Sequence, residues 1–328
     1  MAVLITGAAG FIGMHVAEAL LARGDEVIGV DTLNAYYDTR LKQARLDRLT
    51  QHAGFSFSKT DVADPTAIVD LIAGRPEATR IIHLAAQAGV RYSLKAPFDY
   101  IRANVLGQTA MLEAARALPK LECFIYASSS SVYGANTKVP FAVIDRADKP
   151  VSLYAATKRS GELIAESYHH LYGLPITGLR FFTVYGPWGR PDMAYYLFTN
   201  AITEGIPLTL YDGGRPQRDF TYIDDIVAGI LGAVDATPES RHQVYNLGNN
   251  RTETVTKLVE TIEKAVGRKA LVEAAPLQPG DVTRTYADID TSRQELGFDP
   301  KTTLEEGIPR FVAWYQATDG GRFVRRST

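Results

Sequence analysis

Apolar residues in the first half of the chain occur in short runs that alternate with longer stretches of helical periodicity. Short runs bounded by polar and turn-forming residues are typical of buried strands, and the longer stretches of amphipathic helices. Strands are predicted at residues 2–5, 26–30, 55–59, 80–85, 121–127 and 175–182. Helices are predicted at residues 11–23, 65–73, 97–118 and 152–172. This alternation requires crossover connections and predicts an α/β fold, a doubly wound parallel sheet with helices on both faces.

The pattern changes after about residue 181, where Gly and Pro interrupt shorter segments, as in Gly186-Pro187 and Gly213-Gly214. These breaks favour a smaller region that covers the substrate over a second independent core. Residues 34–49 are interpreted as an insertion that carries a basic helix. We expect its basic side chains to form a solvent-exposed face, with a binding role as the alternative; they are Arg40, Lys42, Arg45 and Arg48.

Composition narrows the classes of function. With 46% hydrophobic and 22% charged residues, the 328-residue chain has an ordinary globular composition. Its net charge of −2 gives no sign of a nucleic-acid or anionic-membrane partner. Neither a signal peptide nor an apolar run of about 18 residues is found, so no membrane association is expected. The one cysteine, Cys123, is interpreted as a buried strand residue, and a reducing, cytoplasmic compartment is expected because it cannot form an internal disulfide.

The first predicted strand leads into a turn in which glycine recurs at every third position, at Gly7, Gly10 and Gly13. Gly7 permits the tight turn, Gly10 lets the backbone approach a pyrophosphate, and Gly13 lets helix and strand pack closely. The free N–H groups at the start of the following helix can then bind the phosphates. Three glycines at this spacing are by themselves weak support for a dinucleotide-binding site. Their position between a predicted strand and a predicted helix makes that prediction much more specific.

An acidic residue, Asp31, ends the second predicted strand. Its carboxylate can accept hydrogen bonds from both ribose hydroxyls of NAD and would repel the extra phosphate of NADP, although a purely local role in a turn is the alternative. Neither Thr32 nor Leu33 offers a guanidinium to that phosphate, so NAD is the expected cofactor. Residues after the third and fourth strands should line the adenosine part of the site: Asp61, Val62, Leu84, Ala85 and Ala86.

Tyr154 and Lys158 are four residues apart in a predicted helix, so both side chains lie on one face. We expect the ammonium and a positive nicotinamide ring to lower the pKa of the tyrosine by about three units, worth about 4 kcal/mol. A phenolate could then remove a proton from a substrate hydroxyl. Ser129, in a row of four serines that could also be a plain polar turn, can hydrogen-bond the same oxygen. Asn104 could hold a water relay to Lys158, unless it faces solvent.

Over essentially its whole length the sequence resembles the extended short-chain dehydrogenase/reductase family of nucleotide-sugar enzymes. The motifs that carry the resemblance are residues 6–13, Asp31, 83–86, Asn104, 128–134, Tyr154 with Lys158, 179–187 and 218–225. By this resemblance the catalytic triad is Ser129, Tyr154 and Lys158. NAD would be bound by Phe11 and Ile12 together with the three glycines, by Asp31 and by Asn104, Tyr154 and Lys158. Arg218 would contact the diphosphate of a nucleotide sugar.

The resemblance also implies a division of the chain. An NAD-binding Rossmann domain is expected over residues 1–180, with about 220–250 returning to it. A smaller substrate-binding α/β region is expected at residues 181–219 and 251–328. The implied partners are a UDP-sugar and a second copy of the chain, joined as a homodimer through a four-helix contact, and no metal is expected.

Enzymes of this family oxidise a sugar hydroxyl at C4, and the residues after the catalytic hydroxyl determine how the resulting ketone reacts. The 4,6-dehydratases carry an Asp-Glu pair there, whereas this chain has Ser130 and Ser131. UDP-glucuronate decarboxylases carry a glutamate at the position of Ser131. Without these groups, the simplest outcome is return of the hydride to the other face of the ketone, which is epimerisation at C4.

Within the family the chain is most similar to the UDP-glucuronate 4-epimerases, in residues 31–38, 88–93 and 180–193. A 4-keto uronate loses carbon dioxide readily, and hydroxyl groups could hold its carboxylate in an unreactive orientation. Those hydroxyl groups would come from Ser129, Ser130, Ser131 and Thr183. Arg190 is the first candidate to pair with the carboxylate and Arg91 the second, with solvent exposure as the alternative for each.

Three other functions stay open. A UDP-glucose 4-epimerase would share every catalytic residue, and a UDP-glucuronate decarboxylase would release carbon dioxide. A catalytically silent NAD-binding regulator is disfavoured because Tyr154 and Lys158 are both retained.

Overall fold

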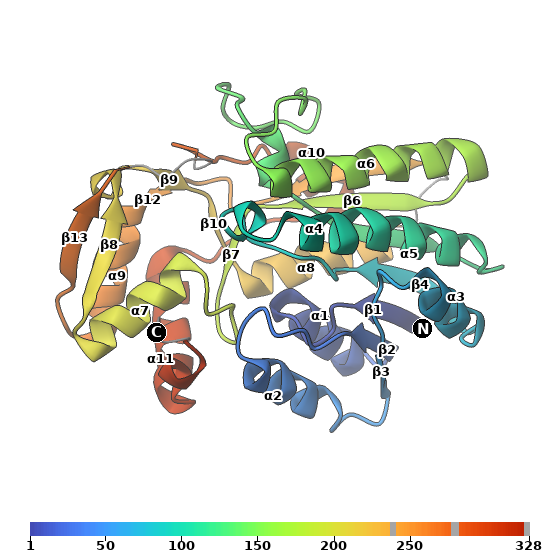
Figure 1. Ribbon diagram of the computed structural model, residues 1–328, viewed down its shortest axis with the longest axis horizontal. Coiled ribbons are helices and arrows are strands. Elements are labelled where there is room, and N and C mark those ends of the chain that lie inside the picture. Colours follow the sequence, from blue (N-terminus) through green and yellow to red (C-terminus); the bar gives the residue numbers. More distant parts are fainter. Residues whose placement is uncertain (237–240, 277–281, 325–328) are drawn as a thin grey trace.

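A seven-stranded parallel sheet forms the larger part of the computed structural model, which describes residues 1–236, 241–276 and 282–324 (Figure 1). The strand order is β11-β6-β5-β4-β1-β2-β3, so the order reverses between β1 and β4. Ligands bind at such a switch point, outside the carboxyl ends of the strands. The strands are β1 (Ala2–Thr6), β2 (Glu26–Asp31), β3 (Phe55–Lys59), β4 (Ala78–His83), β5 (Cys123–Ser129), β6 (Ile176–Phe181) and β11 (His242–Leu247).

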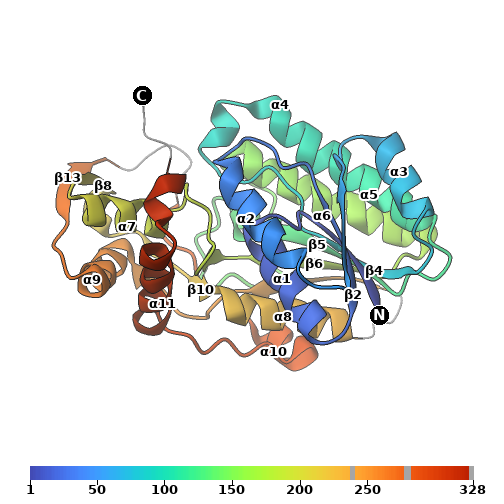
Figure 2. The ribbon, with the colours of Figure 1, turned by 90° about the horizontal axis from the view of Figure 1, so that it is seen from below.

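Helices cover both faces of the sheet, with α3 to α6 on one side and α1, α8 and α10 on the other (Figure 2). Strand β1 explains why both faces need cover, because Val3 and Ile5 pack in one apolar cluster and Leu4 packs in another. The predicted doubly wound parallel sheet is confirmed. These helices are α1 (Phe11–Ala22), α3 (Pro65–Ala73), α4 (Pro97–Tyr100), α5 (Gly107–Arg116), α6 (Leu153–Tyr172), α8 (Ile223–Asp235) and α10 (Asp290–Leu296).

The single helix predicted at residues 97–118 is interrupted. A π-helical segment, Ile101–Leu106, separates α4 from α5. The wider turn buries the side chain of Asn104, which is 5% exposed. Such segments are frequent at functional sites and leave no mark in the apolar periodicity.

The basic helix is α2 (Thr39–Leu49), and the prediction that its charges form a solvent-exposed face is wrong for two of them. Arg45 is fully buried and Lys42 is 6% exposed. Both lie on the stripe of the helix that also buries Leu41 and Leu49. The position of a basic residue within an apolar i, i+3, i+4 stripe was therefore the feature of the sequence that indicated its burial.

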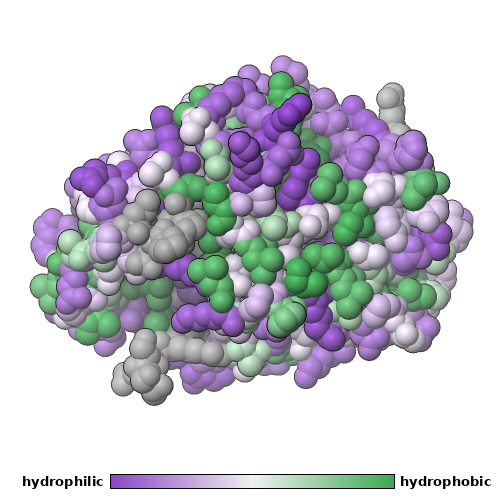
Figure 3. Space-filling view, turned by 45° about the horizontal axis from the view of Figure 1, so that its top comes forward, coloured by the Kyte–Doolittle hydropathy of each residue, from purple (hydrophilic) through white to green (hydrophobic). Residues whose placement is uncertain are grey.

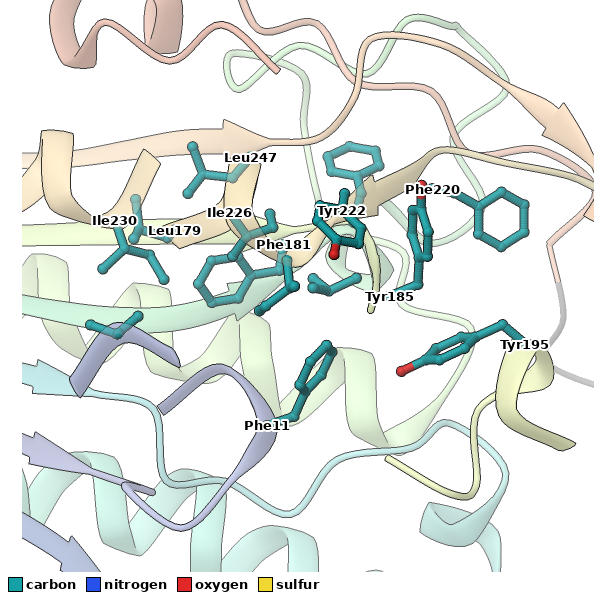
Figure 4. Packing of buried hydrophobic residues seen from close by; sticks show 14 of the residues in the cluster. Phe11, Leu179, Phe181, Tyr185, Tyr195, Phe220, Tyr222, Ile226, Ile230 and Leu247 are labelled. Carbon is teal, nitrogen blue, oxygen red and sulfur yellow. The ribbon is translucent and has the colours of Figure 1, made fainter. Parts of the chain in front are cut away.

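A smaller region beyond the carboxyl ends of the strands shares a core with the sheet. One apolar cluster extends from α1 through β6 into this region, and Figure 4 shows Phe11, Phe181, Tyr185 and Tyr195 within it. Among the described residues, no helix has the length and apolar character needed to cross a bilayer. The region contains α7 (Ala194–Glu204), α9 (Val255–Val266), α11 (Leu304–Ala317) and the strand pairs β7 (Thr183–Tyr185) with β10 (Phe220–Tyr222), β9 (Gln217–Arg218) with β12 (Glu253–Thr254), and β8 (Pro207–Tyr211) with β13 (Leu271–Ala275).

Candidate active site

Two adjoining cavities lie at the carboxyl ends of the strands. The smaller, of about 280 Å³, is lined by the glycine turn, Asp31, Ser129, Tyr154 and Lys158. The larger, of about 1530 Å³, lies between the loop after β4 and the elements α7 and β8 of the smaller region. Both are bordered by Tyr36, Arg190 and Met193. The arrangement suits two ligand parts that meet where the cavities join.

The glycine turn is as tight as its sequence predicts. Gly7 has φ +73°, and its N–H donates to the carbonyl of Val30 at 2.7 Å. A Cβ atom at Gly13 would lie 2.1 Å from the carbonyl oxygen of Gly7. Helix α1 begins with no side-chain cap, so its first N–H groups have no side-chain acceptor at this end. The turn and the helix start therefore fit a phosphate group.

Asp31 ends β2 beside this turn and forms the local hydrogen bonds that the sequence allowed, while its binding of a ribose stays a prediction. Its Oδ1 accepts the N–H of Leu33 at 2.8 Å, and its Oδ2 accepts the N–H of Ala9 at 3.1 Å. The carboxylate also lines the smaller cavity. Local bonds thus hold it at the edge of the cavity, where an oxygen lone pair can accept a hydroxyl donor.

Lys42 is a cavity residue that the sequence did not predict. It lines the smaller cavity, and its Nζ donates to Oδ1 of Asn34 at 2.7 Å. Burial lowers the pKa of Lys42 to about 8, against the attraction of the Asp31 carboxylate. A cation and an anion therefore lie together at the end of the cavity next to β2.

The predicted adenosine-site residues all lie where the sequence placed them, along the smaller cavity. The carboxylate of Asp61 accepts the N–H of Ala63 at 2.9 Å and pairs with Arg102 at 2.7 Å. The N–H of Ala85 donates to Oγ1 of Thr6 at 3.2 Å. The cavity is lined at this point by Asp61, Val62, Leu84, Ala85 and Ala86.

The three candidate catalytic residues meet in the smaller cavity. Ser129 ends β5, while Tyr154 and Lys158 lie on α6 just after its N-cap, Ser152. Nζ of Lys158 donates to the carbonyl of Ala127 at 2.9 Å, and burial lowers the pKa of Lys158 to about 8. This bond fixes α6 against the end of β5.

The predicted depression of the tyrosine pKa is not produced by the protein's own groups. Burial raises the pKa of Tyr154, and a hydrogen bond with Ser129 and the charge of Arg190 lower it only in part. The prediction rested on the nearby cations and left out the desolvation of the phenolate.

Asn104 does not face solvent. Its Oδ1 accepts the N–H of Gln87 at 2.8 Å, and its Nδ2 donates to the carbonyl of Gln87 and to Oγ1 of Thr157, each at 3.0 Å. The amide therefore holds the segment after β4 against α6. A water relay from Asn104 to Lys158 stays a prediction.

The candidate substrate residues are divided between the cavity walls. Thr183, Arg91, Arg190 and Arg218 line the larger cavity. The guanidinium of Arg91 lies over the ring of Tyr211, 4.5 Å from its centre, and Nη1 of Arg218 donates to the carbonyl of Gln217 at 2.9 Å. All four sequence-predicted residues are thus brought to one space.

Arg190 is paired within the protein. Its Nε and Nη2 donate to the two carboxylate oxygens of Asp192 at 3.0 and 2.6 Å. The phenol of Tyr36 donates to the same carboxylate at 3.0 Å. A substrate carboxylate would therefore have to share this guanidinium with Asp192, so its role in recognition stays a prediction.

Of the four serines, two end β5 and two begin a capped turn. Oγ of Ser129 caps a 3₁₀ turn, Ser130–Tyr133, by accepting the N–H of Ser131 at 3.2 Å, and it lies 3.2 Å from Oγ of Ser131. Ser130 and Ser131 do not line either cavity but directly follow Ser129. No residue of this turn is an acid.

A buried ion network next to these serines was not predicted from the sequence. Glu162 accepts two bonds from Arg180 at 2.8 Å, one from Oγ of Ser128 at 2.6 Å and one from Arg159 at 2.7 Å. Burial tends to raise the pKa of Glu162, but the bonds and charge of Arg180 bring it below its ordinary value. The network ties α6, one turn after Lys158, to the ends of β5 and β6.

The comparisons with known proteins agree with this geometry. Residues 4–311 match the family model described as GDP-mannose 4,6-dehydratase. A probable UDP-glucuronate 4-epimerase of Rhizobium meliloti is 48% identical, over 96% of this chain and 97% of that protein. The crystal structure of the Bacillus cereus UDP-glucuronic acid 4-epimerase, in complex with UDP-glucuronic acid and NAD, has a TM-score of 0.91 at 33% identity and covers 97% of this chain and 100% of that one. A Thermotoga maritima UDP-glucose 4-epimerase with UDP-glucose has a TM-score of 0.88 at 30% identity and covers 97% and 99%.

Proposed function

The chain belongs to the GDP-mannose 4,6-dehydratase family, within the extended short-chain dehydrogenases/reductases, and on this basis we propose that it is an NAD-dependent 4-epimerase of UDP-glucuronate. The observation that carries the proposal is the turn after β5, where Ser129 meets Tyr154 and Lys158 and no acid comes next in the chain. A 4,6-dehydratase needs acid–base groups at this place. The family name therefore describes the fold and the shared oxidation at C4, and the serines in place of an acid–base pair argue against elimination.

The residues that line the smaller cavity suit the binding of NAD. The glycine turn leaves room only for a backbone, as the close approach of a Cβ at Gly13 indicates, and helix α1 directs its N–H groups to the phosphates. We assign Asp31 to the adenosine ribose and Tyr154 with Lys158 to the nicotinamide ribose. When bound, NAD supplies reversible hydride acceptance at C4. Further contacts would come from Gly7, Gly10, Phe11, Ile12, Asp61, Val62, Leu84, Ala85, Ala86 and, through Gln87, Asn104.

Tyr154 acts as the acid–base group. Its phenolate takes the proton of the C4 hydroxyl as the C4–H bond is broken and the carbonyl forms, and it returns that proton when C4 is reduced from the other face. Ser129, which hydrogen-bonds Tyr154, holds the reacting oxygen beside it. Lys158 would stabilise the phenolate only together with the positive charge of the bound cofactor, because the protein's own groups do not lower the pKa of Tyr154. The larger cavity gives the sugar room to turn over between the two half-reactions.

Serine and threonine hydroxyls protect the substrate carboxylate. Loss of carbon dioxide requires the C5–C6 bond to overlap the π system of the C4 ketone. Hydroxyl donors that hold the carboxylate in another orientation prevent this overlap. We assign this role to Ser129 in the smaller cavity and Thr183 in the larger one. Ser130 and Ser131, which line neither cavity, would act by holding the turn that positions Ser129. Arg218 would bind the diphosphate, and Arg190 is the first candidate and Arg91 the second to pair with the carboxylate.

The domain division and the homodimer are part of the proposal. The return of β11 beside β6 supports a Rossmann domain at residues 1–180 with about 220–250, and a substrate-binding region at 181–219 and 251–328.

Apolar side chains on α4 and α6, including Phe98 at 83% exposure and Leu163 at 56%, support the four-helix contact of the proposed homodimer. Figure 3 shows apolar residues among polar ones on the side bearing α6. A Phe98→Asp variant should sediment as a monomer and the parent as a dimer.

The single cysteine, Cys123, is buried and unpaired, which supports the cytoplasm as the compartment of this protein.

The proposed function is tested by incubating the purified protein with UDP-glucuronate, without added NAD, and following the products by proton NMR. Formation of UDP-galacturonate supports it. UDP-xylose would mean that the serines do not protect the carboxylate. No change with UDP-glucuronate, together with turnover of UDP-glucose, would favour the neutral-sugar epimerase.

A further inference from the structure

The guanidinium of Arg45 is buried without a carboxylate partner. It is fully buried, and among the described residues it forms no ion pair with a carboxylate. All its bonds go to neutral oxygens. Nη1 donates to the carbonyl of Ala9 at 3.2 Å and to the phenol of Tyr37 at 2.6 Å. Nε and Nη2 donate to the carbonyl of Trp188 at 3.0 and 2.6 Å, and Nη2 also to that of Gly189 at 3.0 Å.

These bonds join two loops that are distant in the sequence. Ala9 belongs to the glycine turn, between Gly7 and Gly10. Trp188 and Gly189 precede Arg190, which lines the smaller cavity together with Met193. One side chain of α2 therefore connects the two walls of the cavity that we assign to NAD.

The second loop depends on such anchors. Three consecutive carbonyls, of Pro187, Trp188 and Gly189, are held from α1 and α2, the first by Nε2 of His15 at 3.0 Å. Burial lowers the pKa of His15 to about 4, so this ring is a neutral donor near pH 7. Trp188 has φ +60°, a conformation that a tryptophan adopts only when its surroundings impose it. The indole also lies under the guanidinium of Arg48, 5.2 Å from its ring centre.

We infer that Arg45 is a positioning residue that retains the cofactor, by fastening the loop at residues 187–190 to the glycine turn and thereby keeping the cavity closed around the dinucleotide. Its charge, uncompensated by a carboxylate, also favours an anion at the adjoining turn. For NAD to leave, the two loops must separate, and separation breaks the bonds by which the buried guanidinium joins them. Its contacts with Tyr37 belong to neither loop. The inference rests on the proposed function only in taking NAD as the ligand of the smaller cavity.

The test measures NAD release independently of catalysis. Parent protein, Arg45→Met and Arg45→Lys are loaded with radiolabelled NAD, freed of unbound nucleotide and chased with unlabelled NAD. Release from Arg45→Met should be at least about tenfold faster than from the parent, equivalent to about 1.4 kcal/mol of barrier. Arg45→Lys, which keeps the charge but loses the forked geometry, should fall between them. If Arg45→Met does not fold, the Arg45→Lys rate decides by itself.

Two control variants separate fastening from general stability. Arg40→Met removes an exposed cation from the same helix and should release NAD at the parent rate. Ile72→Ala opens a cavity in the apolar cluster on the opposite face of the sheet, and should lower the melting temperature without faster release. Equal release rates from the parent and both Arg45 variants would overturn the inference, as would equally fast release from Ile72→Ala. A parent that retains NAD but leaves UDP-glucuronate unchanged would contradict the proposed function and not this inference.

Discussion

Replacing Lys158 by methionine should abolish activity and, at neutral pH, remove a source of instability. Lys158 is buried, at 8% exposure, and the one hydrogen bond that the structure gives its ammonium is to the carbonyl of Ala127. Burial lowers its pKa from 10.5 to about 8. Methionine has a similar length and shape, keeps the packing and carries no charge.

The magnitude is set by that pKa difference. At about 1.4 kcal/mol per pKa unit, burying the ammonium costs about 3 kcal/mol below pH 8. Loss of the donor to Ala127 offsets about 1–3 kcal/mol of the gain in Lys158→Met. We therefore expect the variant to be as stable as the parent at pH 7, or more stable by about 1–2 kcal/mol, although it has lost a catalytic group.

The pH dependence is the sharper test. Below pH 8 the lysine is charged in both the folded and the unfolded protein, so the penalty is complete. Between pH 8 and 10.5 the folded protein releases the proton that the unfolded chain keeps, and the penalty disappears. The parent should therefore gain about 2 kcal/mol on the variant between pH 7 and 9.5.

The assay is urea unfolding of nucleotide-free parent and Lys158→Met at several pH values in this range. Lys257→Met, which removes an exposed lysine, serves as the control and should follow the parent. Parallel stability profiles for the parent and Lys158→Met, with the variant less stable throughout, would refute the reasoning.

Three further predictions concern single groups of the site. Tyr154→Phe should lower kcat by about 10²–10⁴-fold while bound NAD, measured by chromatography of the released nucleotide, stays stoichiometric; an unchanged kcat would remove the tyrosine from the chemistry. Gly13→Ala should purify without nucleotide, since its Cβ would lie 2.1 Å from the carbonyl oxygen of Gly7, and full NAD occupancy would show that the turn can relax. Glu162→Gln leaves the guanidinium of Arg180 buried without its carboxylate and should lower the free energy of unfolding in urea by about 3–5 kcal/mol; a loss below about 1 kcal/mol would mean that water or another group replaces the partner.

The sequence predicted the sheet well because most of its inner strands are buried on both faces. Such strands are continuous apolar runs, and the predicted ends of the first six lie within two residues of those observed. Strand β11 was not predicted as an element, because its first half carries His242 and Gln243. Those residues are only partly buried at the edge of the sheet, where the apolar pattern is weak.

The sequence predicted the parts of the candidate site whose residue pattern has one common function. It missed the parts in which tertiary contacts determine where a side chain lies. A glycine at every third position after a strand, and a tyrosine four residues before a lysine, point to the cofactor and the acid–base group directly. The burial of Arg45 and Lys42 depends on how α2 packs, and the pairing of Arg190 depends on Asp192 two residues later. The packing of α2 cannot be read from its own charges and spacing, and an acid two residues after an arginine does not by itself indicate an ion pair.

The central claim, transient oxidation at C4 with return of the same hydride, is tested most directly with UDP-glucuronate that carries deuterium at C4. The substrate is incubated in ordinary water without added NAD, and the UDP-galacturonate is analysed by NMR and mass spectrometry. The account predicts that deuterium remains at C4 of the product, because the hydride never exchanges with solvent. Deuterium lost from C4 to solvent, or product formed with UDP-xylose as the main species, would contradict it.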